Sequence, residues 1–422
     1  MNQLLKKIWV WILAALIIAV LPWMFPSGFA LSLLGQMGLA IIFALAYNML
    51  LGQGGMLSFG HAIYFGLSGY FTIHFLNVLV ESENAVFPVS LLPLVGGFVA
   101  MFFGILIGYV STRRAGTTFA MISLGFGEMA TAMTLILIAV FNGEEGIQGD
   151  RVTGLETLLG IDYGSNIQVY YLTGVWCMIA MIAMYLITQT PFGRMSNAVR
   201  DNPERVQFVG YNTQRVRWLA FTLSAFFSGV AGALHALNFE HVGFETVGLA
   251  KSGLVLFMVF IGGARIYYGP ILGAILITFL EGNLSGITDA WVFYLGVFFI
   301  VMVMFAPTGL AGLVALHEPV WRVDIKLLRR MVRPYAAVLG AVLMTCIGVI
   351  GLIEMIFFLS HNLTGETSMV LYFLEIRPQS VLPWLSYGVL GAIGVGLCWK
   401  VFPYVGRNWN QVMEQVKQRM AA

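Results

Sequence analysis

Charged residues are scarce in this chain, and their scarcity excludes a soluble domain. Asp, Glu, Lys and Arg make up 10% of the 422 residues, whereas 59% are hydrophobic; a soluble globular domain carries roughly 25% charged residues. The net charge of +2 is too small to favour a nucleic-acid partner. The apolar residues form runs of about 20, the length that an α-helix needs to cross a bilayer. The composition therefore predicts an all-α, polytopic helical membrane protein in contact with membrane lipid.

Cysteine and the motifs of common enzymes are also rare or missing. Cys177, Cys346 and Cys398 lie in or beside apolar runs without the spacing of metal ligands, so we interpret them as packing residues. The sequence contains no H-E-x-x-H or G-x-S-x-G motif. No Lys directly follows a Gly, which excludes a phosphate-binding G-x-x-x-x-G-K-[ST] loop. We expect a chain that is not an enzyme and binds no cofactor, so that any ATPase must be a separate chain.

Basic loops alternate with acidic loops between the apolar runs. The apolar runs predict about twelve spans, ten in a core and two at the C-terminal end. Since basic loops favour the cytoplasmic side, both chain ends are expected in the cytoplasm. The basic start does not indicate a cleaved signal peptide, because a small-residue cleavage site is missing. A short run broken by Gly262 and Gly263 leaves a re-entrant segment open as an alternative to a full span. The expected spans cover about 8–23, 31–51, 56–80, 89–112, 117–140, 168–188, 218–238, 253–263, 270 onward, 291–305, 335–359 and 381–401.

The basic segment Pro191–Arg217 interrupts this pattern. It holds five arginines against two acidic residues, which places it in the cytoplasm. Asn202 can cap a helix whose first turn accepts Pro203, and Gly210 can end that helix in a left-handed conformation. We therefore predict two short helices, joined near Asn202.

Apolar residues in the second short helix indicate a docking role. Val206, Phe208 and Val209 supply an apolar side next to charged residues, the pattern of a helix that binds in a groove of a partner protein. The alternative is a solvated loop that only follows the charge rule.

Polar residues inside the apolar runs are functional candidates. Glu128 lies about 21 Å along a helix from Arg114, and a carboxylate at that depth is costly unless it is paired, protonated or hydrated. His61 and His235 are isolated from other metal-ligating residues in the sequence, and we interpret both as hydrogen-bonded packing residues.

Small residues recur at every fourth position in two spans. Such a stripe allows another helix backbone to approach closely. The run GQGGMLSFGHAIYFG is so rich in glycine that unwound helix is expected there, as tolerated where backbone faces protein or a water-filled path. The stripes comprise Gly54, Ser58, Ala62 and Gly66, and Ser224, Ser228, Gly232 and Ala236.

Five stretches of the chain match a known family in order and spacing. They are LLGQGGMLSFGHAIYFGLSGY (50–70), GTTFAMISLGFGEM (116–129), PFGRMSNAVRDNPERVQFVGYN (191–212), IGGARIYYGPILGA (261–274) and FAPTGLAGL (305–313). With these stretches the chain resembles the membrane permease subunits of ABC importers for branched-chain amino acids, and in particular their LivM branch.

The resemblance implies a type II-like importer fold in which residues 190–217 form the coupling loop. Glu204 and Gly210 occupy the positions of the Glu-Ala-Ala…Gly motif of importer permeases, although Arg205 and Val206 replace the two alanines. The residues expected to couple this chain to an ATPase are Arg194, Arg200, Asn202, Pro203, Glu204, Arg205 and Gly210.

The resemblance also implies partners and a location. Expected partners are a LivH-like second permease, two P-loop ATPase subunits that bind ATP and Mg²⁺, and a periplasmic solute-binding protein, assembled in the bacterial inner membrane. Ser58, His61 and Glu128 are expected to line or gate the translocation path. Residues 1–318 would form the permease core, whereas 319–422 would add a basic cytoplasmic linker, two accessory helices and a cytoplasmic tail.

Two alternatives stay open at this stage. The solute could be a branched-chain or hydrophobic amino acid, or else urea, a short amide or a carboxylate, which the same family also transports. A secondary transporter driven by an ion gradient would use Glu128 as a proton-coupled carboxylate and would transport without ATP.

Overall fold

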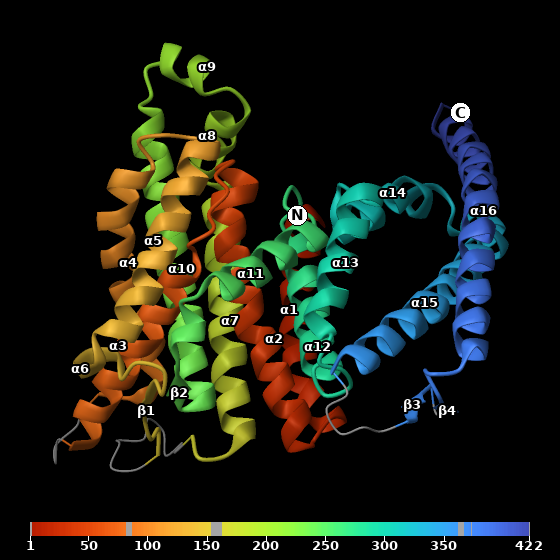
Figure 1. The fold of residues 1–422 in the computed structure, drawn as a ribbon. Coiled ribbons are helices and arrows are strands. Elements are labelled where there is room, and N and C mark those ends of the chain that lie inside the picture. Colours follow the sequence, from red (N-terminus) through yellow and green to blue (C-terminus); the bar gives the residue numbers. More distant parts are fainter. Residues whose placement is uncertain (1, 82–86, 153–162, 362–366, 373, 422) are drawn as a thin grey trace. The chain divides into compact units, whose positions relative to one another are not determined.

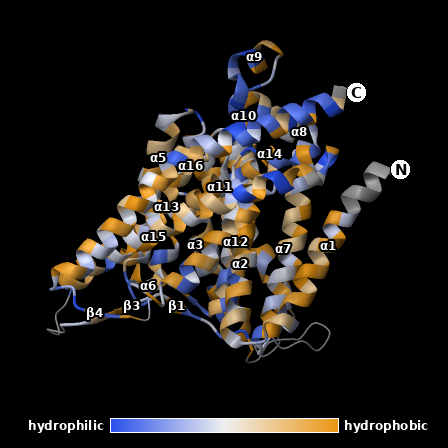
Figure 2. Cartoon of the chain, turned by 90° about the vertical axis from the view of Figure 1, so that its right-hand side faces the viewer, coloured by the Kyte–Doolittle hydropathy of each residue, from blue (hydrophilic) through white to orange (hydrophobic). Residues whose placement is uncertain are grey.

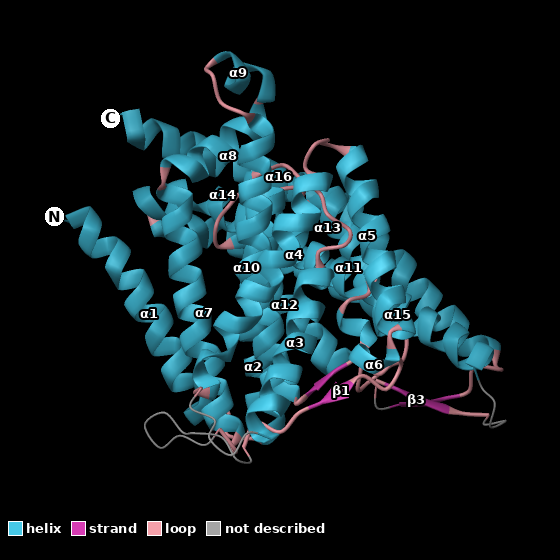
Figure 3. Cartoon of the chain, turned by 90° about the vertical axis from the view of Figure 1, so that its left-hand side faces the viewer, coloured by secondary structure: helices cyan, strands magenta, loops and turns pink. Residues whose placement is uncertain are grey.

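The computed structural model describes residues 2–81, 87–152, 163–361, 367–372 and 374–421, and these are mostly helical (Figure 3). The helices are α1 (Asn2–Met24), α2 (Gly28–Asn48), α3 (Ala62–Glu81), α4 (Leu92–Ser111), α5 (Thr117–Ile136), α6 (Ile138–Phe141), α7 (Asn166–Gln189), α8 (Pro191–Asp201), α9 (Pro203–Phe208), α10 (Thr213–Phe239), α11 (Leu249–Gly262), α12 (Gly269–Leu284), α13 (Trp291–Phe305), α14 (Gly309–Val323), α15 (Val332–His361) and α16 (Val381–Ala421). The antiparallel strand pairs are β1 (Ile147–Gln148) with β2 (His241–Val242), and β3 (Met369–Leu371) with β4 (Leu374–Ile376).

The helices confirm the predicted polytopic membrane protein. Ten segments of the described chain are long and apolar enough to cross a membrane, and Trp9–Met24 and Gly269–Leu284 are two shorter apolar helices. The predicted short span around residue 253 is longer in the structure, because α11 follows a helical turn at Phe244–Thr246.

The chain forms two compact units, Met1–Gly312 and Leu313–Ala422. The boundary lies within α14, whereas the sequence prediction places it between residues 318 and 319. In the second unit α15 and α16 form a hairpin, and an added Cβ at Gly348 would lie 2.5 Å from the Cα of Gly391, so the two backbones approach closely. The buried side chains of Val320, Leu327, Met331, Val412 and Val416 form a separate apolar cluster in this unit.

In the first unit α10 is the most buried span, and it packs against α2, α3 and α4 (Figure 1). Its small-residue stripe allows this packing, because Ser224, Ser228, Gly232 and Ala236 are all buried on the helix. The hydroxyl of Ser68 on α3 donates to the carbonyl of Gly229 on α10 at 2.5 Å.

The prediction that Gly54, Ser58, Ala62 and Gly66 form a stripe on one helix is wrong in part. Ala62 and Gly66 are on α3, but Gly54 and Ser58 precede this helix and are not helical. The predicted span from Met56 therefore becomes a helix only at Ala62. The reason is the packing of the preceding glycines against other backbones, described below.

The two ends of the first unit carry different structures. The helices α8 and α9 lie at one end, and the pair β1 and β2 lies at the opposite end (Figure 1). Beside β2, the buried Arg151 donates from Nε to the Tyr163 carbonyl at 2.8 Å, and its Nη1 lies 3.5 Å from the Glu240 carboxylate. These contacts tie the loop between α6 and α7 to the end of α10, although residues 153–162 of that loop lie outside the described residues.

Candidate coupling segment and discontinuous helix

The basic segment Pro191–Arg217 contains the two predicted short helices, α8 and α9. The side chain of Thr190 caps α8 by accepting from the Gly193 N–H at 3.3 Å. The Oδ1 of Asn202 accepts from the Arg205 N–H at 2.9 Å, which confirms the predicted cap of α9. Pro203 stands in the first turn of α9, where its missing N–H costs no helical hydrogen bond.

Gly210 ends this helical hairpin in the predicted positive-φ conformation. Its φ is +93°, and its N–H donates to the Gln207 carbonyl at 2.9 Å. An added Cβ would meet nothing within 4 Å. The requirement for glycine therefore comes from the backbone conformation and not from crowding.

The apolar residues of α9 divide into an anchored and an exposed group. Val206 is 6% exposed and packs in a cluster with Val199 of α8 and Val216 of α10. Phe208 is 91% exposed and Val209 is 71% exposed. The ribbon around α8 and α9 carries many residues coloured as hydrophilic (Figure 2). The segment thus has a fixed base and an uncovered apolar tip.

The charged residues of the segment also divide. Arg194, Glu204 and Arg205 are exposed, whereas Arg200 is half-buried and turns toward the interior of the unit. The Nε of Arg200 donates to Asp201 Oδ1 at 2.9 Å, and this hydrogen bond and the charge of Arg200 lower the pKa of Asp201, with a smaller contribution from Arg265. The Nη1 of Arg200 donates to the carbonyl of Gly52.

Gly52 belongs to a discontinuous helix between α2 and α3. A π-helical turn, Met49–Gln53, follows α2, and residues 54–61 form a non-helical stretch that the glycine-rich run predicts. We call residues 49–61 the discontinuous segment. A Cβ on Gly52 would collide with the Ala264 carbonyl and the Asn48 side chain, and Gly55 has a φ of +66°.

Hydroxyl groups from distant helices satisfy the backbone of the discontinuous segment. Tyr47 donates to the Ser58 carbonyl at 2.8 Å, and Ser123 of α5 accepts from the Phe59 N–H at 3.0 Å. Ser252 of α11 accepts from the Ala62 N–H at 3.0 Å. Non-helical backbone at membrane depth is tolerated when it is buried in protein with its polar groups paired. The sequence analysis missed Tyr47, Ser123 and Ser252, for which a hydroxyl within an apolar helix is the only local signal.

His61 is enclosed in the protein interior, with no exposed surface. Its Nε2 lies 2.8 Å from the Ser228 hydroxyl and 3.1 Å from the Ser224 hydroxyl. The rings of Phe43 and Tyr47 have centroids 6.0 and 5.2 Å from the imidazole. This geometry is that of a hydrogen-bonded packing residue, as the sequence predicts.

Ser58 and His61 are both buried in the discontinuous segment and both contact Tyr47, whereas Glu128 lies apart from them on α5. Ser58 is 1% exposed, and its hydroxyl has no hydrogen-bond partner among the described residues. Glu128 lies on the exposed face of α5, next to Gly127, where an added Cβ would lie 3.2 Å from the Cα of Gly60. His235 contacts the rings of Phe65 and Phe239, at centroid distances of 5.2 and 4.6 Å.

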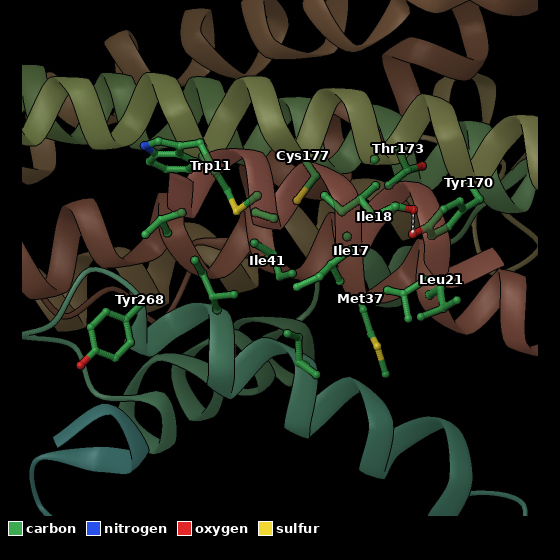
Figure 4. Close-up of a pocket in the computed structure, with 18 of the residues that line it drawn as sticks. Trp11, Ile17, Ile18, Leu21, Met37, Ile41, Tyr170, Thr173, Cys177 and Tyr268 are labelled. Carbon is green, nitrogen blue, oxygen red and sulfur yellow. Dashed lines mark hydrogen bonds between the residues drawn. The ribbon is translucent and has the colours of Figure 1, made fainter. Parts of the chain in front are cut away.

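A cavity of about 600 Å³ lies elsewhere in the unit, between α1, α2, α7 and the start of α12 (Figure 4). Its lining is almost entirely apolar, with Ile17, Met37 and Cys177 among the side chains that face it. Ser58, His61 and Glu128 do not line this cavity. The described residues also contain no group of three or more His, Cys, Asp and Glu that could hold a metal ion.

Comparison with known proteins agrees with this architecture. Residues 29–307 match the family described as branched-chain amino acid transport system / permease component. The chain is 26% identical over 320 residues to the high-affinity branched-chain amino acid transport system permease protein LivM of Salmonella typhimurium, covering 71% of this chain and 74% of that protein. It is 26% identical to LivM of Escherichia coli over 294 residues, which cover 65% of this chain and 66% of that protein.

A more distant relative has a different solute in its name. The autoinducer 2 import system permease protein LsrC of Salmonella paratyphi B is 25% identical over 215 residues, covering 50% of this chain and 58% of that protein. No solved structure matches the chain. Because the family match spans well over half of the chain, this multi-pass membrane protein belongs to the branched-chain amino acid transport system permease family.

Proposed function

We propose that this chain forms half of the translocation path of an ATP-driven importer and that residues 190–217 bind a separate ATPase subunit. The observation that carries the proposal is the capped pair α8 and α9, which holds Phe208 almost fully exposed above a buried base. An exposed aromatic residue beside arginines is typical of the centre of a protein interface. Glu204 and Arg205 of α9 and Arg194 of α8 are also exposed and are available to contact a partner.

The names of the relatives support a proposal for the solute, and the family resemblance of the sequence supports one for the remaining partners. The LivM proteins are named for branched-chain amino acid transport, so we propose a branched-chain or other hydrophobic amino acid as the solute. The partners would be a second permease of the LivH type, two ATPase subunits that bind ATP and Mg²⁺, and a periplasmic solute-binding protein. The complex would lie in the bacterial inner membrane with both ends of this chain in the cytoplasm. Ser58, His61 and Glu128 are the residues proposed to line or gate the path.

Affinity purification from native membranes in mild detergent, followed by mass spectrometry, tests the proposal. Wild-type chain should retain a second permease and P-loop ATPases. Phe208→Ala should lower ATPase recovery about tenfold, the effect of losing a modest interface hot spot. Phe29→Ala removes another exposed ring, 63% exposed at the start of α2, and should leave recovery unchanged.

Two results would overturn the proposal. The first is recovery of the chain alone in several detergents, combined with ATP-independent transport after reconstitution, which is the behaviour of a secondary transporter. The second is unchanged ATPase recovery with Phe208→Ala, which would remove the docking role of α9.

A further inference from the structure

Arg200 is the point at which the basic segment contacts the discontinuous segment. The two are 148 residues apart in the sequence, yet the Arg200 guanidinium donates to the Gly52 carbonyl. This carbonyl lies at the break in the helix, where the N–H groups of Gly55 and Met56 donate to Leu51 and Leu50 at 3.0 Å each. The arginine thus supplies a donor to a carbonyl at the end of a helix.

The aliphatic part of Arg200 makes a second contact. An added Cβ at Gly55 would lie 2.6 Å from the Cγ of Arg200, and Gly55 has a φ of +66°. Only glycine can adopt this conformation freely and leave room for the arginine stem. The discontinuous segment is therefore in contact with Arg200 on both sides of Gln53.

The guanidinium is held in place from the other side as well. Its Nε donates to Asp201 Oδ1 at 2.9 Å, while its Nη1 reaches Gly52. A planar guanidinium can make both bonds in one fixed orientation, whereas an ammonium group cannot. Arg200 thus joins the end of α8 to the discontinuous segment through a rigid connection.

The discontinuous segment connects further to three spans. Its Phe59 N–H donates to Ser123 of α5, and its His61 binds Ser228 of α10. Directly after the segment, the N–H of Ala62 donates to Ser252 of α11. Gly60 of the segment packs on Gly127, the neighbour of Glu128. A displacement of this segment would therefore move Ser58 and His61, which belong to it, and would change its contact with Gly127 of α5.

From these contacts we propose that Arg200 transmits movement of α8 and α9 to the discontinuous segment, and that this segment is the part of the chain that opens or closes the path. The inference rests on the proposed function, since a bound ATPase supplies the movement. Arg200 acts here as a positioning residue that does not touch the solute. Coupling of this kind needs a packed element that both sites can shift, which the discontinuous segment provides.

The test uses the complete importer, purified with its ATPases and reconstituted with the solute-binding protein and L-leucine. Arg200→Ala removes the donor to Gly52, and Gly55→Ala strains the backbone against the arginine stem. Both variants should retain the ATPases, yet lose leucine-stimulated ATP hydrolysis and leucine transport by about tenfold or more, within the range of allosteric coupling energies. Basal ATP hydrolysis without leucine is measured in the same preparations, so that stimulation by leucine is expressed relative to it.

Two matched variants control for charge and strain. Arg114→Ala removes an exposed arginine from the turn after α4, on the same predicted side of the membrane. Gly116→Ala introduces a side chain at a φ of +67° but meets nothing within 4 Å. Both should transport leucine at wild-type rates.

The outcomes separate this inference from the proposed function. Wild-type stimulation in Arg200→Ala, with the ATPases still bound, would overturn the transmission role and leave the importer intact. A wild-type chain that retains no ATPase would overturn the proposed function itself. Loss of ATPase retention in Arg200→Ala would show that Arg200 only supports the docking surface and would also overturn the transmission role.

Discussion

The Ser228 hydroxyl lies 2.8 Å from Nε2 of His61 and joins the centre of α10 to the discontinuous segment. Both side chains are fully buried, so water cannot take the place of either hydrogen-bond partner in this conformation. The small-residue stripe of α10 therefore has two uses, since it allows close packing and also supplies hydroxyls to a histidine.

Ser228→Ala should destabilise the protein by about 1–3 kcal/mol, because a buried ring nitrogen loses its shorter hydrogen bond. Thermal unfolding in detergent measures the change. Ser386→Ala removes an exposed hydroxyl that bonds within its own helix, to Pro383, and should change the stability by less than about 0.5 kcal/mol. Equal stability of wild type and Ser228→Ala would show that Ser224 alone satisfies His61.

Gly210→Pro should uncouple ATP hydrolysis from transport while membrane insertion stays normal. The substitution removes the N–H that donates to Gln207, and proline cannot adopt a φ of +93°. ATP consumed per leucine transported is the quantity to measure. Normal coupling in this variant would contradict a role for the end of α9.

Arg205→Glu should also weaken coupling, because it reverses an exposed charge beside Phe208 without changing the fold. The same ratio of ATP to leucine measures the effect, together with ATPase recovery. Arg114→Glu is the matched control, since it reverses an exposed arginine outside the basic segment. If both reversals have the same effect, the cause is the net charge of this face and not docking.

Glu128→Gln should alter the transport rate if the carboxylate lines the path, because the substitution keeps the shape and removes the charge. Transport of leucine is measured across pH in both proteins. If the variant transports leucine at the wild-type rate at every pH, Glu128 is an exposed helix residue without a role in the path. Transport that becomes independent of a proton gradient would instead favour the secondary transporter.

Arg151→Met should loosen the loop between α6 and α7, because Arg151 binds the carbonyls of Tyr163 and Leu237 and the carboxylate of Glu240. Losing a buried charged donor should cost about 1–3 kcal/mol. Limited proteolysis of the loop in right-side-out vesicles gives the measurement, with Arg377→Met as the control on an exposed arginine. Equal cleavage rates would show that the pairing of β1 with β2 holds the loop by itself.

The sequence by itself determined the features that depend on near neighbours in the chain. The caps at Asn202 and Gly210 are local, since each involves backbone groups three residues away. The spans follow from the length of the apolar runs. The break before Ala62 follows from the clustered glycines, which have no side chains and are weak helix formers.

Only the tertiary structure decided which residues bind the discontinuous segment and which polar residues are buried. Ser123 binds Phe59 of this segment from 64 residues away, and Arg200 binds Gly52 from 148 residues away. Ser252 binds Ala62, directly after the segment, from 190 residues away. Helix periodicity cannot predict such pairs, because they depend on which helix faces pack together. For the same reason, the sequence does not show that Ser58 and His61 are buried. Glu128 also lies within an apolar run, yet it is on the exposed face of α5.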